Sequence, residues 1–308
     1  MKVYFPKEEV RGVCRNIFMP GIANNPRVTL CSSEEDAELI LISEAHIRKK
    51  YRIKYPEKTA LLDYKDSPFR LNAGPLLYFK SSVVDKGKME FVEYRNNIRV
   101  IPISYCLRQE VLDFDVETER DLDVCFIPRV LSEVHRKKPL ENLGKRALKV
   151  LEINQRIGDT IQQNFDNSFV GNVGDAGGKG RNIIQTPYFE KLLGSKIVVT
   201  CNPPDWEGDY RLFEALGCGP LVLVDEMLTP VKNAFEDGKH LVYYKRDQPE
   251  DLIEKLRYYL DHEDERQQVA LQGYEYAKKH HKPIDRIDEV LDEFVRVKGT
   301  YRKRKKGV

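Results

Sequence analysis

The stretch SKIVVTCNPPDWEGDYRLFEALGCGPLVLVDEM (195–227) decides the fold. Its apolar run KIVVTC (196–201) predicts a buried strand, because the run is rich in β-branched residues and too short for a helix. After a polar loop, DYRLFEALG (209–217) predicts a helix that begins at Asp209 as its N-cap and ends near a pair of glycines. The run PLVLVDE (220–226) predicts the next strand. Strand, helix and strand in this order indicate parallel neighbours in an α/β sheet.

The alternation continues on both sides of this stretch. In the second half we expect further strands at 123–128, 168–173 and 240–244, and helices at 141–157, 186–195, 249–262, 263–281 and 284–297. In the first half we expect strands at 2–5, 37–43, 59–64, 76–80 and 99–104, with one short helical stretch at 43–52.

An acidic segment, DFDVETERDLD (113–123), separates the two halves. We therefore predict an α/β protein with two doubly wound domains and a cleft between them. The first, at 1–118, is the smaller; the second covers 119–297, and residues 298–308 form a basic disordered tail. In sheets of this kind, ligands bind outside the carboxyl ends of the strands.

Composition excludes several classes of protein. The 308 residues are 41% hydrophobic and 32% charged, with a formal net charge of only +2, so the chain does not have the charge of a nucleic-acid binder. Between Phe294 and Val308 there are seven basic residues and no acidic one, so the basic character belongs to the tail. We find no apolar run long enough to span a membrane and no signal peptide, and the six dispersed cysteines indicate reduced thiols. We therefore expect a cytoplasmic protein.

The helix at 209–217 is the first candidate site. Its N-terminus follows a buried strand, so its amides face the carboxyl edge of the sheet and could bind an anion such as phosphate. Arg211 and Glu214 are three residues apart and share one face of this helix. Spacing alone leaves open the alternative that they form an ordinary exposed ion pair.

A family resemblance begins at the same residues. The string YRLFEALGCGPLVLVDE resembles the donor-binding signature of GT-B glycosyltransferases, and most closely their exostosin-like and spore-maturation-like C-terminal domains. The similarity continues through FEDGKHLVYYKRDQPEDLIEKLRYYLDHEDERQQVALQGYEYAKKHH (235–281) and covers about residues 123–297. The resemblance implies a GT-B-like pair of Rossmann-type domains and a nucleotide-diphosphate sugar as donor, with UDP-sugars favoured. It also implies that Glu214 accepts hydrogen bonds from the ribose and that Arg211 neutralises the diphosphate.

Three further residues are candidates for donor binding, together with Asp209. Arg129 follows the strand at 123–128, and Lys179 and Arg181 belong to the glycine-rich loop GDAGGKGR (174–181). Such a loop can hold a diphosphate through its backbone N–H groups. The alternative is a flexible surface loop, since the sequence is not a Walker A motif.

An inverting sugar transfer also needs a base that takes the proton of the acceptor hydroxyl. We expect it on the first domain, across the cleft, where Asp63 and Asp66 lie at the end of the strand at 59–64. Asp66 is the first choice; Glu44 and His46, after the strand at 37–43, are the reserve. The pair His280 and His281 is expected to be solvated. We expect no metal and no cofactor, because no D-x-D motif lies at a strand end.

The sequence is compatible with three functional hypotheses. The first is a metal-independent, inverting glycosyltransferase (EC 2.4) that acts on a glycan or another hydroxyl acceptor. The second is a non-catalytic nucleotide- or sugar-binding module of the same fold. The third uses the basic tail for weak peripheral contact with a membrane surface or for contact with nucleic acid. We favour the first and expect no nucleic-acid partner.

Overall fold

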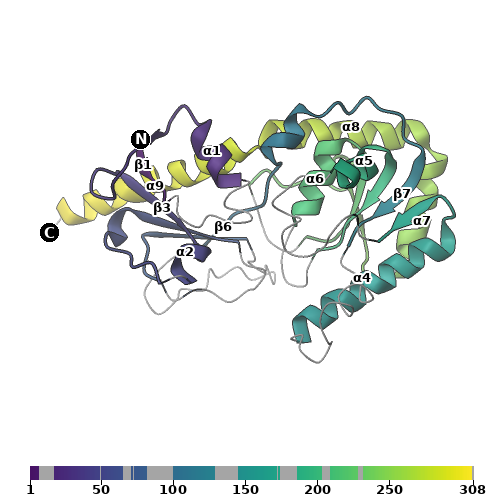
Figure 1. Cartoon of the computed structure of the whole chain (residues 1–308), viewed down its shortest axis with the longest axis horizontal. Coiled ribbons are helices and arrows are strands. Elements are labelled where there is room, and N and C mark those ends of the chain that lie inside the picture. The colour runs from purple at the N-terminus through teal and green to yellow at the C-terminus, as the bar shows by residue number, and fades with distance from the viewer. Residues whose placement is uncertain are drawn as a thin grey trace.

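The protein was analysed as a computed structural model, which describes residues 1–6, 17–48, 50–64, 71, 73–81, 100–128, 145–171, 173, 186–202, 209–227 and 232–306. Figure 1 shows two sheets side by side along the long axis of the molecule, each packed against helices. The α/β class expected from the alternating pattern is confirmed.

The first sheet is built from the first third of the chain. Its strands are β1 (Lys2–Tyr4), β2 (Thr29–Leu30), β3 (Leu39–Ser43), β4 (Thr59–Asp63), β5 (Leu77–Lys80) and β6 (Val100–Pro102). They are all parallel, in the order β2-β1-β3-β4-β5-β6. The strand order reverses between β1 and β3, which is the point where open α/β sheets bind ligands.

The second sheet repeats this design. Its strands are β7 (Leu122–Phe126), β8 (Ser168–Val170), β9 (Ser195–Val199), β10 (Leu221–Asp225) and β11 (Val242–Tyr244). They are parallel in the order β11-β10-β9-β7-β8, so the strand order reverses between β7 and β9. The segment that follows β9 leads into the helix with Arg211 and Glu214.

Helices connect the strands and finish the chain. They are α1 (Met19–Ala23), α2 (Glu44–Arg48), α4 (Lys145–Asn164), α5 (Thr186–Leu193), α6 (Tyr210–Cys218), α7 (Pro249–Asp261), α8 (Glu263–His280) and α9 (Pro283–Lys306), with short 3₁₀ turns η2 (Pro56–Lys58) and η3 (Gln109–Asp113). Across the described ranges, none of these helices is both long enough and apolar enough to cross a membrane.

Helices cover both faces of the second sheet. Along β10 the side chains alternate: Leu221 and Leu223 pack into a cluster with residues of α4 and α7. Val222 and Val224 point to the opposite face and join a cluster with residues of α5 and α6. This alternation of apolar residues on both faces is why the strand reads as one continuous hydrophobic run, and it makes the sheet doubly wound.

The last helix returns to the first sheet. Figure 1 shows α9 running from the second sheet to the far end of the first, so that both termini lie at the same end of the molecule. The apolar side of α9, with Ile287, Val290, Leu291 and Phe294, is buried in the core cluster that contains the first sheet. The expected domain boundary at 118/119 assigned residues 283–297 to the second domain. In the structure these residues complete the core of the first sheet.

The predicted disordered tail is wrong for residues 298–306, because α9 continues to Lys306. Lysine and arginine are good helix formers, and positive charges near a helix C-terminus interact favourably with the helix dipole. The basic run is thus compatible with helix. Residues 307–308 lie outside the described part of the chain.

Two crossover segments join the halves and contact each other. One follows β6 and the other lies between α8 and α9; the Leu107 amide donates to the His281 carbonyl at 2.8 Å. His281 was expected to be solvated, but its side chain is fully buried, its ring stacks on Phe235, and its Nε2 bonds to the Asn233 carbonyl at 2.9 Å. Burial lowers the pKa of His281 well below its ordinary value, so the imidazole is neutral at pH 7.

Candidate functional site

The candidate site is built around the first turn of α6. Asp209 caps the helix: its Oδ1 accepts the amides of Arg211 at 2.7 Å and Leu212 at 3.3 Å, as the sequence predicts for an N-cap. Its Oδ2 accepts from Arg211 Nη1 at 2.6 Å. Asp209 therefore fixes the direction of the Arg211 guanidinium, which is partly exposed. An anion at this helix end would meet the guanidinium of Arg211, because Asp209 already uses two of the amides.

Glu214 lies one turn further along α6 and is buried. Two side chains hold its carboxylate: Arg108 Nη1 donates to Oε1 at 3.3 Å, and the Tyr188 hydroxyl donates to Oε2 at 2.8 Å. Arg108 comes from the crossover after β6 and Tyr188 from α5, so three separate elements meet at this carboxylate. Glu214 is therefore fixed in place rather than part of an exposed Arg–Glu pair.

Tyr188 and Arg108 orient the Glu214 carboxylate. Burial, and then the charge of Glu214, raises the pKa of Tyr188 well above its ordinary value, so the phenol keeps its proton and donates it. The buried Arg108 provides the opposite charge. Carboxylate oxygens accept hydrogen bonds from hydroxyl groups, and a guanidinium pairs with anions. The arrangement can bind a diol on one side and an anion at Arg211 on the other.

The carboxyl edge of the first sheet faces this site. Tyr64 follows β4 and packs against Tyr105, with ring centroids 5.1 Å apart. Tyr105 follows β6 and packs against Tyr210, the first residue of α6, at 5.3 Å. These rings link the ends of β4 and β6 in the first sheet to helix α6 of the second.

Asp63, one of the two predicted bases, does not face a cleft. Its side chain is fully buried, forms an ion pair with Lys80 Nζ at 3.3 Å, and accepts from the Tyr78 hydroxyl at 2.5 Å. The strand pairing explains this, because Asp63 and Lys80 lie directly opposite each other on β4 and β5. A carboxylate in such a pair is poorly suited to take a proton from an acceptor.

Four other predicted site residues cannot be placed. Asp66, Arg129, Lys179 and Arg181 all lie outside the described residues. The structure thus brings together Asp209, Arg211 and Glu214, and places Asp63 in the core of the first sheet.

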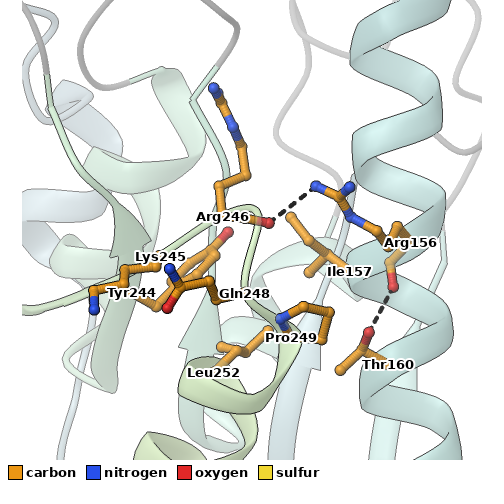
Figure 2. A pocket seen from close by; sticks show the side chains of 9 residues that line it. All are labelled: Arg156, Ile157, Thr160, Tyr244, Lys245, Arg246, Gln248, Pro249 and Leu252. Atoms are coloured by element: carbon orange, nitrogen blue, oxygen red, sulfur yellow. Dashed lines mark hydrogen bonds between the residues drawn. The ribbon is translucent and has the colours of Figure 1, made fainter.

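A second polar cluster lies at the carboxyl ends of β9, β10 and β11. The Asp225 carboxylate accepts the Asn202 amide at 2.6 Å and Arg246 Nη1 at 3.2 Å. Burial raises the pKa of Asp225 to about 7. Arg246 also borders a small hollow between α4 and the start of α7, shown in Figure 2, where its backbone carbonyl accepts from Arg156 Nη2 at 3.0 Å. The Arg246 guanidinium points away from the apolar side chains of this hollow, toward the strand ends.

In the parts of the chain that the structure describes, no group of three or more His, Cys, Asp or Glu side chains could hold a metal ion.

Sequence reasoning missed Arg108 and Tyr188. They lie 106 and 26 positions away from Glu214 in the chain, and only tertiary packing brings them together. Tyr188 stands two residues after Thr186, the predicted N-cap of its helix, so its place on the first turn could have been found. Arg108 stands in the plain string YCLRQE, which carries no comparable signal.

Comparison with known proteins gives one family match, and it covers part of the chain. Residues 159–292 match a family model described as glycosyl transferase-like. No curated protein matches the chain in sequence.

Several solved structures resemble the whole arrangement. HepE of Anabaena, solved with UDP, has a TM-score of 0.54 at 10% identity, and the match covers 96% of this chain and 99% of HepE. An α-glucosyltransferase solved with UDP and a mismatched DNA has a TM-score of 0.53 at 12% identity, covering 96% and 98%. A TarM variant of S. aureus, solved with fondaparinux, α-GlcNAc-glycerol and UDP, has a TM-score of 0.52 at 9% identity, covering 83% and 55%.

The chain thus spans about half the length of TarM and nearly all of the other two. At these identities the likeness shows the fold. It is the GT-B fold with two Rossmann-like domains, as the sequence predicts.

Proposed function

We propose that this chain, a GT-B protein whose residues 159–292 match the glycosyl transferase-like family, transfers a sugar from a nucleotide-diphosphate sugar to a hydroxyl acceptor. The observation that carries this proposal is the Glu214 carboxylate, held by Arg108 and Tyr188 at the carboxyl edge of the second sheet. The exostosin-like subgroup of the resemblance is part of the same proposal.

Glu214 is suited to bind the ribose. A carboxylate can accept two neighbouring hydroxyl donors, and the 2′- and 3′-hydroxyls of a ribose offer that pair. Because Glu214 is already oriented by two donors, binding costs little reorganisation. This role follows the resemblance and fits the geometry of α6.

Arg211 is suited to bind the diphosphate. It lies one turn before Glu214 on the same helix, and Asp209 directs one of its nitrogens while other N–H donors remain for phosphate oxygens. In the transfer step the negative charge grows on the leaving diphosphate, and a fixed guanidinium at a helix N-terminus stabilises that charge. We propose that this arrangement replaces a metal ion, and that Arg129, Lys179 and Arg181 add to it.

UDP-sugars are the favoured donors. HepE, TarM and the α-glucosyltransferase were all solved with UDP. We propose the same donor preference for this chain. We also propose an inverting mechanism, with a hexosyl or pentosyl group as the transferred group.

A thermal-shift screen tests nucleotide binding. A ligand that binds only the native state stabilises it by RT ln(1 + [L]/Kd), so we expect UDP and UDP-sugars to raise the Tm more than ADP does. The shift should be unchanged in EDTA. An equal response to every nucleotide would contradict the donor preference, and loss of the response in EDTA would contradict the metal-free site.

The second candidate function is a nucleotide-binding module without activity. It is favoured by the burial of Asp63, which removes one of the two predicted bases. Release of UDP from a UDP-sugar separates the two candidates: an enzyme releases UDP at a rate proportional to protein concentration, and a binding module releases none.

A further inference from the structure

The basic run at the end of α9, residues 302–306, is not used by the proposed donor site. It consists of five consecutive Lys and Arg residues, and the sequence has no acidic residue from Phe294 onward. The backbone of the run is helical to Lys306. Its five charges therefore lie within about 7 Å along the helix axis, which is less than the Debye length of about 8 Å at physiological ionic strength. They act together on an approaching partner.

Helix stability alone does not account for this basic run. Earlier in α9 the acidic residues have partners within the protein: Asp288 and Asp292 pair with Arg27 at 2.9 Å and 2.7 Å. Positive charges near a helix C-terminus favour the helix, but like charges three or four positions apart repel each other. The basic run contains three such pairs, one of them Arg302 with Lys306. The concentration of charge is therefore better explained by a partner of opposite charge.

The end of α9 lies near the edge of the first sheet where the strands begin. Glu38 immediately precedes β3 and accepts the amide of Lys2 in β1 at 2.9 Å. This bond lowers the pKa of Glu38, and the charge of Lys298 adds to the effect, so Lys298 lies near the starts of β1 and β3. The opposite edge, where the strands end, is linked to α6 by the rings of Tyr64 and Tyr105. A partner at the end of α9 therefore leaves that opposite edge uncovered.

The shape of the molecule presents the basic run to a flat surface. Figure 1 shows that α9 projects beyond the first sheet at the end of the molecule where both termini lie. A flat surface that approaches this end meets the helix first. Without the seven basic residues after Phe294 the chain carries a net negative charge, so an anionic surface attracts the end of α9 and repels the remainder. This distribution of charge orients the protein on such a surface.

Two exposed apolar side chains lie at the same end. Leu30 in the edge strand β2 is 42% exposed, and Val295 on α9 is 55% exposed. Leu30 lies opposite Val3 of β1, and Val295 lies one turn before Lys298. Apolar side chains beside a cluster of positive charge suit a membrane surface, where acyl chains lie beneath the phosphate groups. A nucleic-acid backbone offers the phosphates without such an apolar layer.

We propose that the end of α9 binds an anionic phospholipid bilayer. The basic run at 302–306 contacts the lipid phosphates, and Leu30 and Val295 contact the boundary between head groups and acyl chains. The carboxyl edge of the first sheet and helix α6 stay open to substrates. The inference is independent of the proposed function, because membrane binding can be measured whether or not the chain transfers a sugar.

The test measures sedimentation of the full chain with lipid vesicles. One set of vesicles is pure phosphatidylcholine, and the other contains two parts phosphatidylcholine to one part phosphatidylglycerol. We expect the chain to bind the second set and not the first, and its affinity to fall as the salt concentration rises. Equal binding to both sets, or binding to neither, would overturn the proposal.

A variant without the five charges tests the basic run. Glutamine is a good helix former, so the helix is kept. The substitutions are Arg302→Gln, Lys303→Gln, Arg304→Gln, Lys305→Gln and Lys306→Gln. Each Lys or Arg near an anionic membrane contributes roughly fivefold in affinity, so we expect this variant to bind acidic vesicles about 10²–10³-fold more weakly.

The matched control changes the net charge by the same amount elsewhere. It replaces five exposed basic residues in the half of the chain that contains the second sheet: Lys145→Gln, Lys149→Gln, Lys245→Gln, Arg257→Gln and Lys279→Gln. Its affinity for acidic vesicles should stay within about threefold of wild type, because the charges nearest the surface remain. An equal loss of binding in both variants would show that only net charge matters and would overturn the proposal.

A second variant keeps every charge and removes the two apolar side chains. Leu30→Thr and Val295→Gln retain the strand and helix propensities of their positions. We expect this double variant to bind acidic vesicles about tenfold more weakly, because the contact with the acyl chains is lost. Wild-type affinity for the vesicles would overturn the role of these two side chains.

Nucleic acid is the alternative partner for a basic run. A short duplex DNA and a single-stranded RNA are therefore titrated in the same buffer. We expect both to bind more weakly than acidic vesicles. If either binds more tightly, and the double variant Leu30→Thr with Val295→Gln binds it as wild type does, the end of α9 is a nucleic-acid site and the proposal is overturned.

Discussion

At the scale of single residues, Glu214 is held from two sides by protein donors. This changes the choice of substitution that tests it. Alanine would leave the buried Arg108 without its carboxylate, and removing one partner of a buried pair costs about 3–5 kcal/mol of stability. A variant of the same shape is needed to separate binding from folding.

We predict that Glu214→Gln lowers UDP affinity by about 10- to 100-fold, because a charge-assisted bond to a ribose hydroxyl contributes about 1.5–3 kcal/mol. The amide keeps a carbonyl oxygen as acceptor for Tyr188 or Arg108, so the fold is retained. Calorimetry with UDP gives the affinity. Glu110→Gln is the control, because Glu110 is also near Arg108, at 3.6 Å, but is half exposed and lies off α6. Wild-type affinity in Glu214→Gln would mean that Glu214 supports the fold alone.

The raised pKa of Asp225 leads to a prediction about how stability depends on pH. Burial raises its pKa to about 7, so between pH 4 and pH 7 the folded protein binds a proton that the unfolded chain has lost. Its contribution to stability is therefore complete below the unfolded pKa and is lost as the pH rises through about 7. Asp225→Asn cannot titrate. We expect the Tm of wild type minus that of Asp225→Asn to decrease from pH 5 to about pH 7 and then to level off. Parallel Tm curves would contradict the raised pKa.

At the scale of elements, two helices each contain a glycine whose neighbours determine whether an alanine can replace it. A Cβ on Gly273 of α8 would overlap the carbonyl oxygen of His240, a backbone atom that cannot rotate away. A Cβ on Gly158 of α4 would lie 2.8 Å from a methyl group of Val170, which can rotate. Because Gly273 has no side chain, α8 can pack directly against the backbone of the segment before β11.

We predict that Gly273→Ala destabilises the protein by about 3 kcal/mol or more, at the upper end of the cost of overpacking. Gly158→Ala should change stability by less than about 1 kcal/mol, because the gain in helix propensity offsets the shift of Val170. Urea unfolding of both variants measures this. Equal stability of the two variants would show that the α8 contact can relax.

The same scale shows what the sequence could predict. The strands were predictable because each is a short apolar run bounded by turn residues, and the cap of α6 because Asp209 has a suitable side chain. The two-residue β2 was not, since Thr29–Leu30 is too short to form a pattern. Helix α4 extends to Asn164, beyond the predicted end at 157, because Gly158 is a packing position rather than a helix end.

Long-range pairing accounts for the other misses. The burial of His281 depends on Phe235 and Asn233, which lie far away in the chain. The ion pair of Asp63 with Lys80 depends on the register of β4 and β5. Composition near either residue contains no sign of these contacts. The roles of Asp209, Arg211 and Glu214 as a group were visible because they lie within one helix.

At the scale of the whole molecule, Arg286 joins the crossover segments. It is fully buried, bonds to the Ser104 hydroxyl and the His280 carbonyl, and pairs with Glu289 at 3.2 Å. Ser104 follows the first sheet and His280 ends α8, so this one side chain holds the connections in both directions.

We predict that Arg286→Met lowers stability by about 3–5 kcal/mol, because it leaves the half-buried Glu289 without its partner. The control Arg296→Met, in the same helix, removes an exposed pair with Glu293 and should cost less than about 1 kcal/mol. Calorimetry should show one transition for both variants, since one core cluster extends through both sheets. Two separate transitions for wild type would contradict that continuity.

The return of α9 to the first sheet has a consequence for synthesis on the ribosome. The first sheet emerges early, but the helix that covers one of its faces is translated only after every strand of the second sheet. Until then the surface that receives Ile287, Leu291 and Phe294 is open to water and to other chains. The second sheet can bury both its faces with its own helices, so the half made later is the one able to finish folding first. The residues of the first sheet therefore remain prone to aggregation for nearly the whole time of translation. We expect chaperones that bind exposed apolar segments to assist the folding of this chain.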